Sequence, residues 1–349
     1  MRYTLLGRSG LRVSEVALGT MTFGEVWGWG ASEDESRRIF DAYVEAGGNF
    51  VDTACNYTDG QSEELVGAFT ESERERFVLA TKYTLTSQRN DPNAGGNHRK
   101  NLVQTLEASL RRLRTDYVDL LWLHMWDGMT PVEEVVRALD DLVSAGKVLY
   151  VGISDTPAWV VSRAVTLAQQ YGWSPFVAVQ GPYSLADRAV ERELLPMAAD
   201  LGLAFTPWGM LEGGALTGKY LDDTDEPRRY ESGGPKTNAI AREVIGVAEE
   251  LDATPAHVAI AWVRAQPWQL IPIVGARSET QLRENLGALD VHLSSEQIER
   301  LDTASGFRLG FPREFLESEH VRGLIFGDTF DLIDDRAGAP RGGNEVAVA

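Results

Sequence analysis

Short apolar runs alternate with longer segments of helical periodicity along most of the chain. Eight runs are rich in Val, Leu and Ile and lack a strict alternation of apolar and polar positions, which is typical of parallel strands buried on both faces. These predicted strands lie at residues 15–18, 49–51, 77–81, 118–123, 148–153, 176–180, 204–208 and 270–274. Ahead of them, residues 3–5 and 11–13 flank a Gly-Arg-Ser-Gly turn, which predicts a short hairpin.

The segments between the predicted strands carry helix signals. Ser32 and Glu35 have the spacing of a capping box, and the glycines at 47 and 48 end that helix. Further helices are predicted along a leucine face at 102–113, between Pro131 and Gly146, and at 158–171, 190–201, 240–251, 255–265 and 295–303. Because strand and helix alternate so regularly, the sequence predicts an α/β fold, a closed (β/α)8 TIM barrel with an N-terminal β-hairpin.

One barrel domain is predicted over residues 1–349, with its strand and helix core at about 15–304. Three long loops, at 23–31, 87–100 and 213–237, each follow a predicted strand and are expected at the mouth of the barrel, where loops of this length are usually functional. A C-terminal segment, 305–349, is expected to pack on the barrel as far as about Leu332, with a frayed end. The aromatic residues behind this expectation are Phe307, Phe311, Phe315, Phe326 and Phe330.

Composition and charge exclude several classes of partner. The 349 residues carry a formal net charge of -19, which repels nucleic acid and anionic lipid. Cys55 is the single cysteine, so no intrachain disulfide is possible and a reducing, cytoplasmic location is expected. Residues 1–20 show no signal-peptide pattern, and no run of about 18 apolar residues is present, so no membrane segment is expected.

Polar residues stand at or just beyond the carboxyl ends of three predicted strands. Asp52 ends the second strand, Lys82 the third and His124 the fourth, and Tyr57 follows Asp52 by five positions. Taken singly, each has an ordinary structural interpretation, such as a loop carboxylate or a hydrogen-bonded core histidine. In a barrel the carboxyl ends of the strands meet on one face, where barrel enzymes place their chemistry. Because polar side chains buried there are costly unless they are paired, their joint placement favours a catalytic site.

The chemistry of this set suits the reduction of a carbonyl group by hydride. A buried Lys82 ammonium stays charged beside Asp52, and its field is expected to lower the pKa of Tyr57 from about 10. Tyr57 would then act as general acid and base on the carbonyl oxygen, while His124 orients the same oxygen through a hydrogen bond.

Over nearly its whole length the chain resembles the aldo-keto reductase superfamily, and most closely its bacterial branch that also resembles potassium-channel β subunits. The order and spacing of the matching fragments are highly specific, although each fragment alone is weak. The fragments are Leu18-Gly19-Thr20-Met21-Thr22-Phe23-Gly24, Phe50-Val51-Asp52-Thr53-Ala54 with Tyr57, Gly152-Ile153-Ser154, Gln180 ahead of Pro182-Tyr183-Ser184-Leu185, Gly213-Gly214 with Leu216-Thr217-Gly218-Lys219-Tyr220, and Gly275-Ala276-Arg277 with Gln281-Leu282 and Glu284-Asn285.

The resemblance implies a catalytic tetrad of Asp52, Tyr57, Lys82 and His124, and a nicotinamide cofactor bound along the barrel mouth. It implies that Ser154, Asp155 and Gln180 hold the carboxamide, that Trp208 stacks on the nicotinamide ring, that residues 211–219 wrap the pyrophosphate, and that residues 277–285 hold the adenosine end. The cofactor-binding residues expected on this basis are Gly19, Thr20, Met21, Asp52, Ser154, Asp155, Gln180, Trp208, Gly209, Leu211, Gly213, Leu216, Gly218, Lys219, Gly275, Arg277, Gln281, Glu284 and Asn285. No metal site is expected.

Two departures from the family pattern bear on the cofactor. Position 155 is Asp where members more often have Asn, so the carboxamide loses a donor and keeps an acceptor for its NH2 group. Around position 275 a Lys-Ser pair is replaced by Gly275-Ala276, which leaves Arg277 as the cation for a 2′-phosphate. NADPH is therefore the expected cofactor, with NADH as the alternative.

Trp27, Trp29, Tyr83 and Trp126, together with the 88–98 loop, are expected to form the substrate pocket. A mouth rich in Trp fits apolar or ring-shaped aldehydes and ketones, although indole side chains often only pack. Two alternatives stay open: a reductase of nucleotide sugars in deoxysugar synthesis, and a cofactor-binding regulatory subunit with little turnover. The sequence leaves monomer and homo-oligomer undecided.

Overall fold

Eight parallel strands form the barrel that the sequence predicts. In this computed structural model, which describes residues 1–86, 88–221 and 234–333, the strands follow the order β10-β3-β4-β5-β6-β7-β8-β9. The sheet closes between its two ends, where the Phe205 amide donates to Gln269 O at 2.9 Å and the Ile271 amide donates to Phe205 O at 2.9 Å. The strands are β3 (Ala17–Gly19), β4 (Phe50–Asp52), β5 (Val78–Tyr83), β6 (Val118–Leu123), β7 (Val148–Ser154), β8 (Phe176–Pro182), β9 (Ala204–Trp208) and β10 (Ile273–Gly275).

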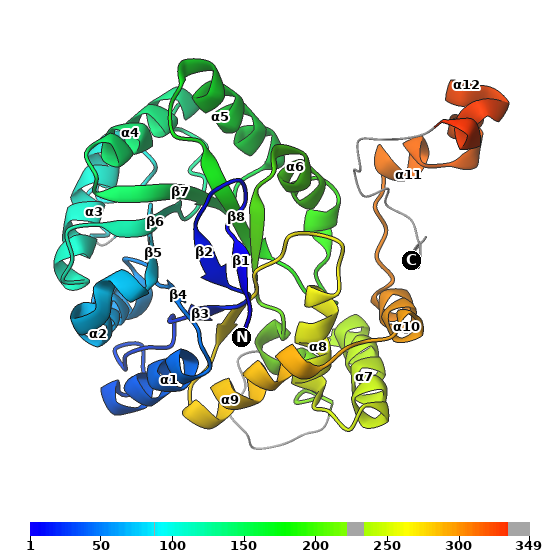
Figure 1. Cartoon of the computed structure of the whole chain (residues 1–349), viewed down its shortest axis with the longest axis horizontal. Helices are drawn as coiled ribbons and strands as arrows, with labels where there is room; N and C mark the ends of the chain where they lie inside the picture. Colours follow the sequence, from blue (N-terminus) through cyan, green and yellow to red (C-terminus); the bar gives the residue numbers. More distant parts are fainter. Residues whose placement is uncertain (87, 222–233, 334–349) are drawn as a thin grey trace.

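A hairpin of β1 (Tyr3–Leu5) and β2 (Arg12–Ser14) covers the amino-terminal end of the barrel (Figure 1). The second strand begins one residue later than expected. Leu6 and Val13 of this hairpin are fully buried in the inner core, together with Phe50 and Trp122 from the strands. The hairpin therefore closes one end of the barrel with apolar side chains and leaves the other end for polar groups.

Helices surround the strands, as Figure 1 shows, and their inward faces form a second apolar layer with the outer faces of the strands. They are α1 (Glu33–Glu45), α2 (Gln61–Thr70), α3 (Arg99–Arg112), α4 (Val132–Ser144), α5 (Ala158–Tyr171), α6 (Leu194–Leu201), α7 (Gly234–Glu250), α8 (Pro255–Arg264), α9 (Glu279–Gly287), α10 (Ser295–Ser305), α11 (Arg313–Leu316) and α12 (Glu319–Phe326). None of the helices within the described residues is both long and apolar enough to cross a membrane.

Several details of the helices differ from the sequence expectations. Helices α2 and α9 were not expected, and the predicted helix at 190–201 is a short 3-10 turn followed by α6. Helix α7 begins at Gly234, inside the predicted loop at 213–237. Residues 222–233 of that loop, and Ser87 of the loop at 87–100, lie outside the described residues.

The predicted capping box at Ser32 and Glu35 forms in part. The Ser32 hydroxyl accepts from the Glu35 amide at 3.3 Å, but the Glu35 carboxylate accepts from the Glu279 amide at 2.7 Å. Only half of the predicted capping box forms, because α9 competes for Glu35.

The C-terminal segment does not pack as its aromatic content suggested. Phe307 lies against Arg188 and Arg192, but Phe311 is 84% exposed and Phe315 is 55% exposed. In Figure 1, α11 and α12 extend beyond α10, away from the ring of helices. The expectation that these aromatic residues cover the barrel is wrong for most of them. An aromatic side chain favours burial, but its presence in the sequence does not show which surface it packs against. The predicted frayed end, from 334 on, lies outside the described residues.

Candidate active site

A buried ion pair marks the carboxyl-terminal end of the barrel. Lys82 is 0% exposed and Asp52 is 2% exposed, and the Lys82 ammonium forms an ion pair with Asp52 Oδ2. Lys82 Nζ also donates to Thr53 O at 2.8 Å, and Gln180 Nε2 donates to Asp52 Oδ1 at 3.2 Å. The pairing across β4, β5 and β8 explains how both charges are tolerated inside the barrel.

Strand register brings these residues together. Asp52 lies opposite Ala80 on β5, and Lys82 lies opposite Trp122 on β6. Since side chains alternate between the two faces of a strand, Lys82 points into the barrel. Burial lowers the pKa of Lys82, but the Asp52 carboxylate and Tyr57 together raise it by more. The pKa of Lys82 therefore lies above the ordinary lysine value. Lys82 is therefore a fixed positive charge.

Tyr57 and His124 stand over this charge. Lys82 Nζ lies 4.8 Å from the centroid of the Tyr57 ring, and the rings of Tyr57 and His124 are 6.0 Å apart at an interplanar angle of 81°. The four residues that the sequence assigned to catalysis therefore converge in one place. A carbonyl oxygen beside Tyr57 and His124 would meet two hydrogen-bonding groups backed by one buried cation.

The pKa of Tyr57 shifts in the direction opposite to the sequence expectation. Burial raises the pKa, and the Asp52 and Asp155 carboxylates raise it further, whereas Lys82 lowers it by a smaller amount. The expected lowering was wrong because the sequence shows the neighbouring cation but not the loss of solvent. Tyr57 is consequently protonated at neutral pH, which is the form that donates a proton.

His124 is neutral over the same range. Burial, with a contribution from the Lys82 charge, lowers its pKa to about 3. The structure gives His124 Nδ1 no hydrogen-bond partner among the described residues. A neutral imidazole beside Tyr57 can donate or accept a hydrogen bond without adding charge to the site.

Unpaired polar atoms continue from His124 toward β7. Ser154 Oγ and Asp155 Oδ1 are buried and have no hydrogen-bond partner among the described residues, although the Trp208 and Ser154 side chains lie close enough to Asp155 to lower its pKa. Ser154 lies opposite Gln180 on β8, and the Asp155 amide donates to Gln180 O at 3.2 Å. Buried polar atoms are usually paired, so this group fits a polar ligand such as a carboxamide. Asp155 has a φ of +41°, and burial raises its pKa.

A turn rich in glycine follows β9 at the same end of the barrel. Trp208 is the last residue of β9 and is 39% exposed, and Gly209 follows it with a φ of +77°. The 3-10 turn Glu212–Thr217 contains Gly213 and Gly214 at positive φ. Of the other residues expected here, Leu211 and Lys219 are partly exposed, Leu216 is fully buried, and Gly218 has a φ of +85°. Such a turn lets backbone N–H groups approach an anionic ligand closely.

The residues expected at the adenosine end surround the start of α9. Arg277 and Glu284 are exposed, and the Arg277 amide donates to Gln281 Oε1 at 2.8 Å. Asn285 is buried and donates to Gly275 O at 3.1 Å. Gly19, Thr20 and Met21 lie beside them on and after β3, which pairs with β10, and the Thr20 amide donates to Asp52 O at 3.0 Å. The expected cofactor residues thus form one band from β7 to α9.

The expected pocket wall is only partly at the mouth. Trp27 and Trp29 lie 5.6 Å apart between ring centroids and are partly exposed, and Trp126 is partly buried. Tyr83 is fully buried in the layer between strands and helices, with its hydroxyl 3.4 Å from Asn97 O. Tyr83 therefore does not line the mouth, because it neighbours Lys82 on a strand and points to the opposite face.

Asn97, which lies in the expected 88–98 pocket loop but was not singled out from the sequence, organises the same region. Its side chain is fully buried, donates to Thr84 Oγ1 at 3.0 Å and to Met125 O at 2.9 Å, and accepts from the Asp127 amide at 2.7 Å. Thr84 has a φ of +111°, a strained value for a β-branched residue. Asn97 therefore ties the loop after Lys82 to the loop after His124.

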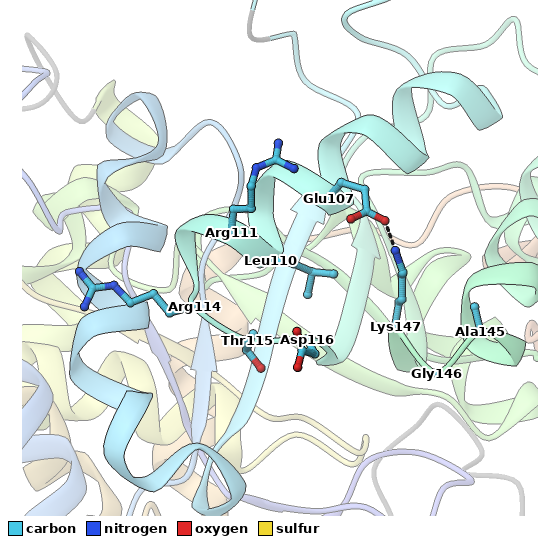
Figure 2. Close-up of a pocket in the computed structure, with 9 residues that line it drawn as sticks. All are labelled: Glu107, Leu110, Arg111, Arg114, Thr115, Asp116, Ala145, Gly146 and Lys147. Atoms are coloured by element: carbon cyan, nitrogen blue, oxygen red, sulfur yellow. Dashed lines mark hydrogen bonds and ion pairs between the residues drawn. The ribbon is translucent and has the colours of Figure 1, made fainter.

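A separate hollow lies at the other end of the barrel. Figure 2 shows it between the end of α3 and the starts of β6 and β7, with the Glu107–Lys147 ion pair across it. It is lined by Glu107, Leu110, Arg111, Arg114, Thr115, Asp116, Ala145, Gly146 and Lys147. Because His124 and Ser154 are at the opposite ends of β6 and β7, this hollow is not part of the candidate active site.

Comparison with known proteins finds matches over nearly the whole chain. The model of the family described as "Aldo/keto reductase family" matches residues 15–305. A norsolorinic acid reductase of Aspergillus flavus is 39% identical, over 89% of this chain and 83% of its own length. An aryl-alcohol dehydrogenase (NADP+) of Phanerodontia chrysosporium is 38% identical, over 92% and 88%. A putative aryl-alcohol dehydrogenase of Saccharomyces cerevisiae is 36% identical, over 88% and 87%.

Proposed function

Because this chain belongs to the aldo/keto reductase family and is thereby an NAD(P)H-dependent oxidoreductase, we propose that it reduces an aldehyde or ketone to an alcohol with NADPH. The observation that carries the proposal is the convergence of Tyr57 and His124 over the buried Lys82–Asp52 pair. When bound, the nicotinamide supplies the hydride. The band of unpaired polar atoms at His124, Ser154 and Asp155 fits its carboxamide.

The residues of the chain manage the proton and the charge. Tyr57 is held protonated by burial, so it donates its proton to the carbonyl oxygen as negative charge develops there. His124 orients the carbonyl by a hydrogen bond, and Lys82 stabilises the tyrosinate that remains after proton transfer. Asp52 keeps Lys82 charged and in place. Solvent then returns a proton to Tyr57.

The substrate that we propose carries an aromatic ring. The relatives include an aryl-alcohol dehydrogenase and a reductase of norsolorinic acid, and this chain places Trp27 and Trp29 beside the turn that follows Tyr57. Two tilted indole rings offer a flat apolar wall to a substrate ring.

The first test is the consumption of NADPH in the presence of benzaldehyde, with protein fluorescence titrated by NADPH and NADH in parallel. Aldehyde-dependent oxidation of NADPH supports the proposal. Cofactor binding without turnover of aldehydes or nucleotide sugars would support a regulatory subunit, and turnover of nucleotide sugars alone would support the alternative reductase.

Arg277→Ala is expected to weaken NADPH binding about tenfold to a hundredfold and to leave NADH binding nearly unchanged. The exposed guanidinium at the start of α9 is the cation that we assign to the 2′-phosphate, and NADH lacks that group. The measurement is the dissociation constant of each cofactor. Arg283→Ala, on the same helix but paired with Glu45 and Glu279, is the control and should change neither constant. Equal losses for both cofactors in Arg277→Ala would rule out the 2′-phosphate contact.

The pH profile of carbonyl reduction is expected to show no histidine step. An ordinary histidine changes its charge between about pH 5 and 8. Burial lowers the pKa of His124 to about 3 and raises that of Tyr57, so His124 stays neutral and Tyr57 stays protonated across that window. The measurement is kcat/KM for reduction against pH. An inflection near 6.5 that disappears in His124→Gln would contradict this assignment.

A further inference from the structure

The loop that carries Trp27 is tied to the turn that presents Tyr57. The loop is closed at its base, where the Gly24 amide donates to Ala31 O at 2.9 Å and the Ala31 amide donates to Thr22 O at 2.7 Å. Three further hydrogen bonds then join it to residues 58–61: Thr58 Oγ1 to Phe23 O at 2.7 Å, the Glu25 amide to Gln61 Oε1 at 3.0 Å, and Trp27 Nε1 to Asp59 Oδ1 at 3.2 Å. The loop and the turn therefore form one unit.

The turn itself has an unusual backbone. Thr58, Asp59 and Gly60 follow Tyr57 with φ values of +46°, +56° and +97°. Asp tolerates this region better than most residues, but Thr does not, and such strain persists only where surrounding contacts hold it. Thr58 is held by its bond to Phe23 O and by accepting from the Ser62 amide at 3.0 Å. The left-handed backbone turns the Asp59 carboxylate toward the indole.

Asp59 makes no contact with the Lys82 network. Its side chain is exposed, and the interaction that fixes it is the bond to the indole N–H of Trp27. An indole has a single donor, so this bond fixes the direction of the ring's N–H edge, and the contact with Trp29 limits rotation of the ring plane. Trp29 packs against the same ring at an interplanar angle of 35°. Asp59, which holds the Trp27 ring, follows Tyr57 by two residues in the sequence.

We propose that Asp59 is the positioning residue of Trp27, and that this pair sets the preference of the site for carbonyl compounds that carry an aromatic ring. The inference rests on the proposed carbonyl reduction. A substrate ring that stacks on an indole already held in place loses little further entropy on binding, whereas a small aliphatic aldehyde has no ring to stack on the indole. Because the pair is joined to the Tyr57 turn, the substrate ring and the general acid keep one relative position.

The test compares three substitutions at Asp59 with benzaldehyde and butanal. Asp59→Ala and Asp59→Gly both remove the acceptor, but Ala strains the left-handed backbone and Gly relaxes it. Asp59→Asn keeps an acceptor and a residue suited to this backbone. We expect KM for benzaldehyde to rise about tenfold in both the Ala and Gly variants, the value of one hydrogen bond. KM for butanal, kcat for both substrates and the Asn variant should stay near the wild-type values.

A second comparison removes the donor. Trp27→Phe keeps a ring but loses the indole N–H, so adding Asp59→Gly to it should have no further effect on KM for benzaldehyde. Equal changes for benzaldehyde and butanal would overturn the proposal, because they would mean that Asp59 acts on the Tyr57 turn and not through Trp27. Failure of Asp59→Asn to restore the wild-type KM would also overturn it.

Binding separates this inference from the proposed function. The dissociation constants of benzyl alcohol and butanol, measured by calorimetry on the protein with NADP+, give the same comparison without turnover. If the protein reduces no aldehyde but the benzyl alcohol constant still depends on Asp59, the proposed function fails and the positioning role stands. If reduction occurs and neither constant nor KM depends on Asp59, the positioning role fails alone.

Discussion

Tyr57→Phe is expected to lower kcat for carbonyl reduction by about 10³-fold while the dissociation constant of NADPH stays unchanged. The substitution removes the hydroxyl that donates the proton but keeps the ring, which lies 4.8 Å from Lys82 Nζ and edge-on to His124. Burial keeps that hydroxyl protonated in the wild type, so the loss is of the acid itself and not of a charged group. Steady-state kinetics and fluorescence titration measure the two quantities.

Tyr83→Phe is the matched control for this prediction. Tyr83 lies one residue beyond Lys82, but its side chain is buried on the other face of β5 and its hydroxyl only reaches Asn97 O at 3.4 Å. Its removal should leave kcat within about threefold of the wild type, because one weak neutral hydrogen bond away from the reacting atoms is lost. A Tyr57→Phe enzyme as active as Tyr83→Phe would reject Tyr57 as the general acid.

The barrel and the face on which these polar residues meet followed from the sequence because the ends of the strands can be recognised in it. Asp52, Lys82 and His124 each interrupt an apolar run at its carboxyl end, and parallel strands place those ends on one face. The burial of Tyr83 behind the strand could also have been predicted, since side chains alternate along a strand and Tyr83 directly follows Lys82. The fold and the four residues at its centre were therefore predictable from local pattern and period.

Features that depend on distant segments were not predictable in this way. The direction of the Tyr57 pKa shift depends on how much solvent the closed site excludes, which no local pattern encodes. Asn97 and Asp59 act through hydrogen bonds to residues 13 to 32 positions away, so no local pattern singles out either residue, although Asn97 lies in the 88–98 loop that was expected at the pocket. The C-terminal aromatic residues were assigned to the barrel on hydrophobicity alone, and Phe311 remains exposed.

Lys82→Met is expected to abolish turnover and to lower the free energy of unfolding by about 3–5 kcal/mol, the cost of leaving one member of a buried ion pair without its partner. Met keeps nearly the length of the side chain, but Asp52, 2% exposed, then retains the Gln180 hydrogen bond at 3.2 Å as its one side-chain bond among the described residues. Tyr57 also loses the Lys82 charge that lowers its pKa, so its pKa should rise further. Denaturant unfolding measures the first effect and reduction of benzaldehyde the loss of turnover.

The double substitution Asp52→Asn with Lys82→Met separates the two roles of the ion pair. It removes both charges, so the buried unpaired carboxylate no longer exists and much of the lost stability should return, since neutral replacements of buried ion pairs are often tolerated. Turnover should not return, because a neutral site cannot stabilise the tyrosinate left after proton transfer. A double variant that regained activity along with stability would mean that Lys82 and Asp52 serve only to hold the end of the barrel together. Lost stability together with lost activity in both variants would mean that the hydrogen bond from Lys82 to Thr53 O, which both variants lack, and not charge balance, holds this end of the barrel.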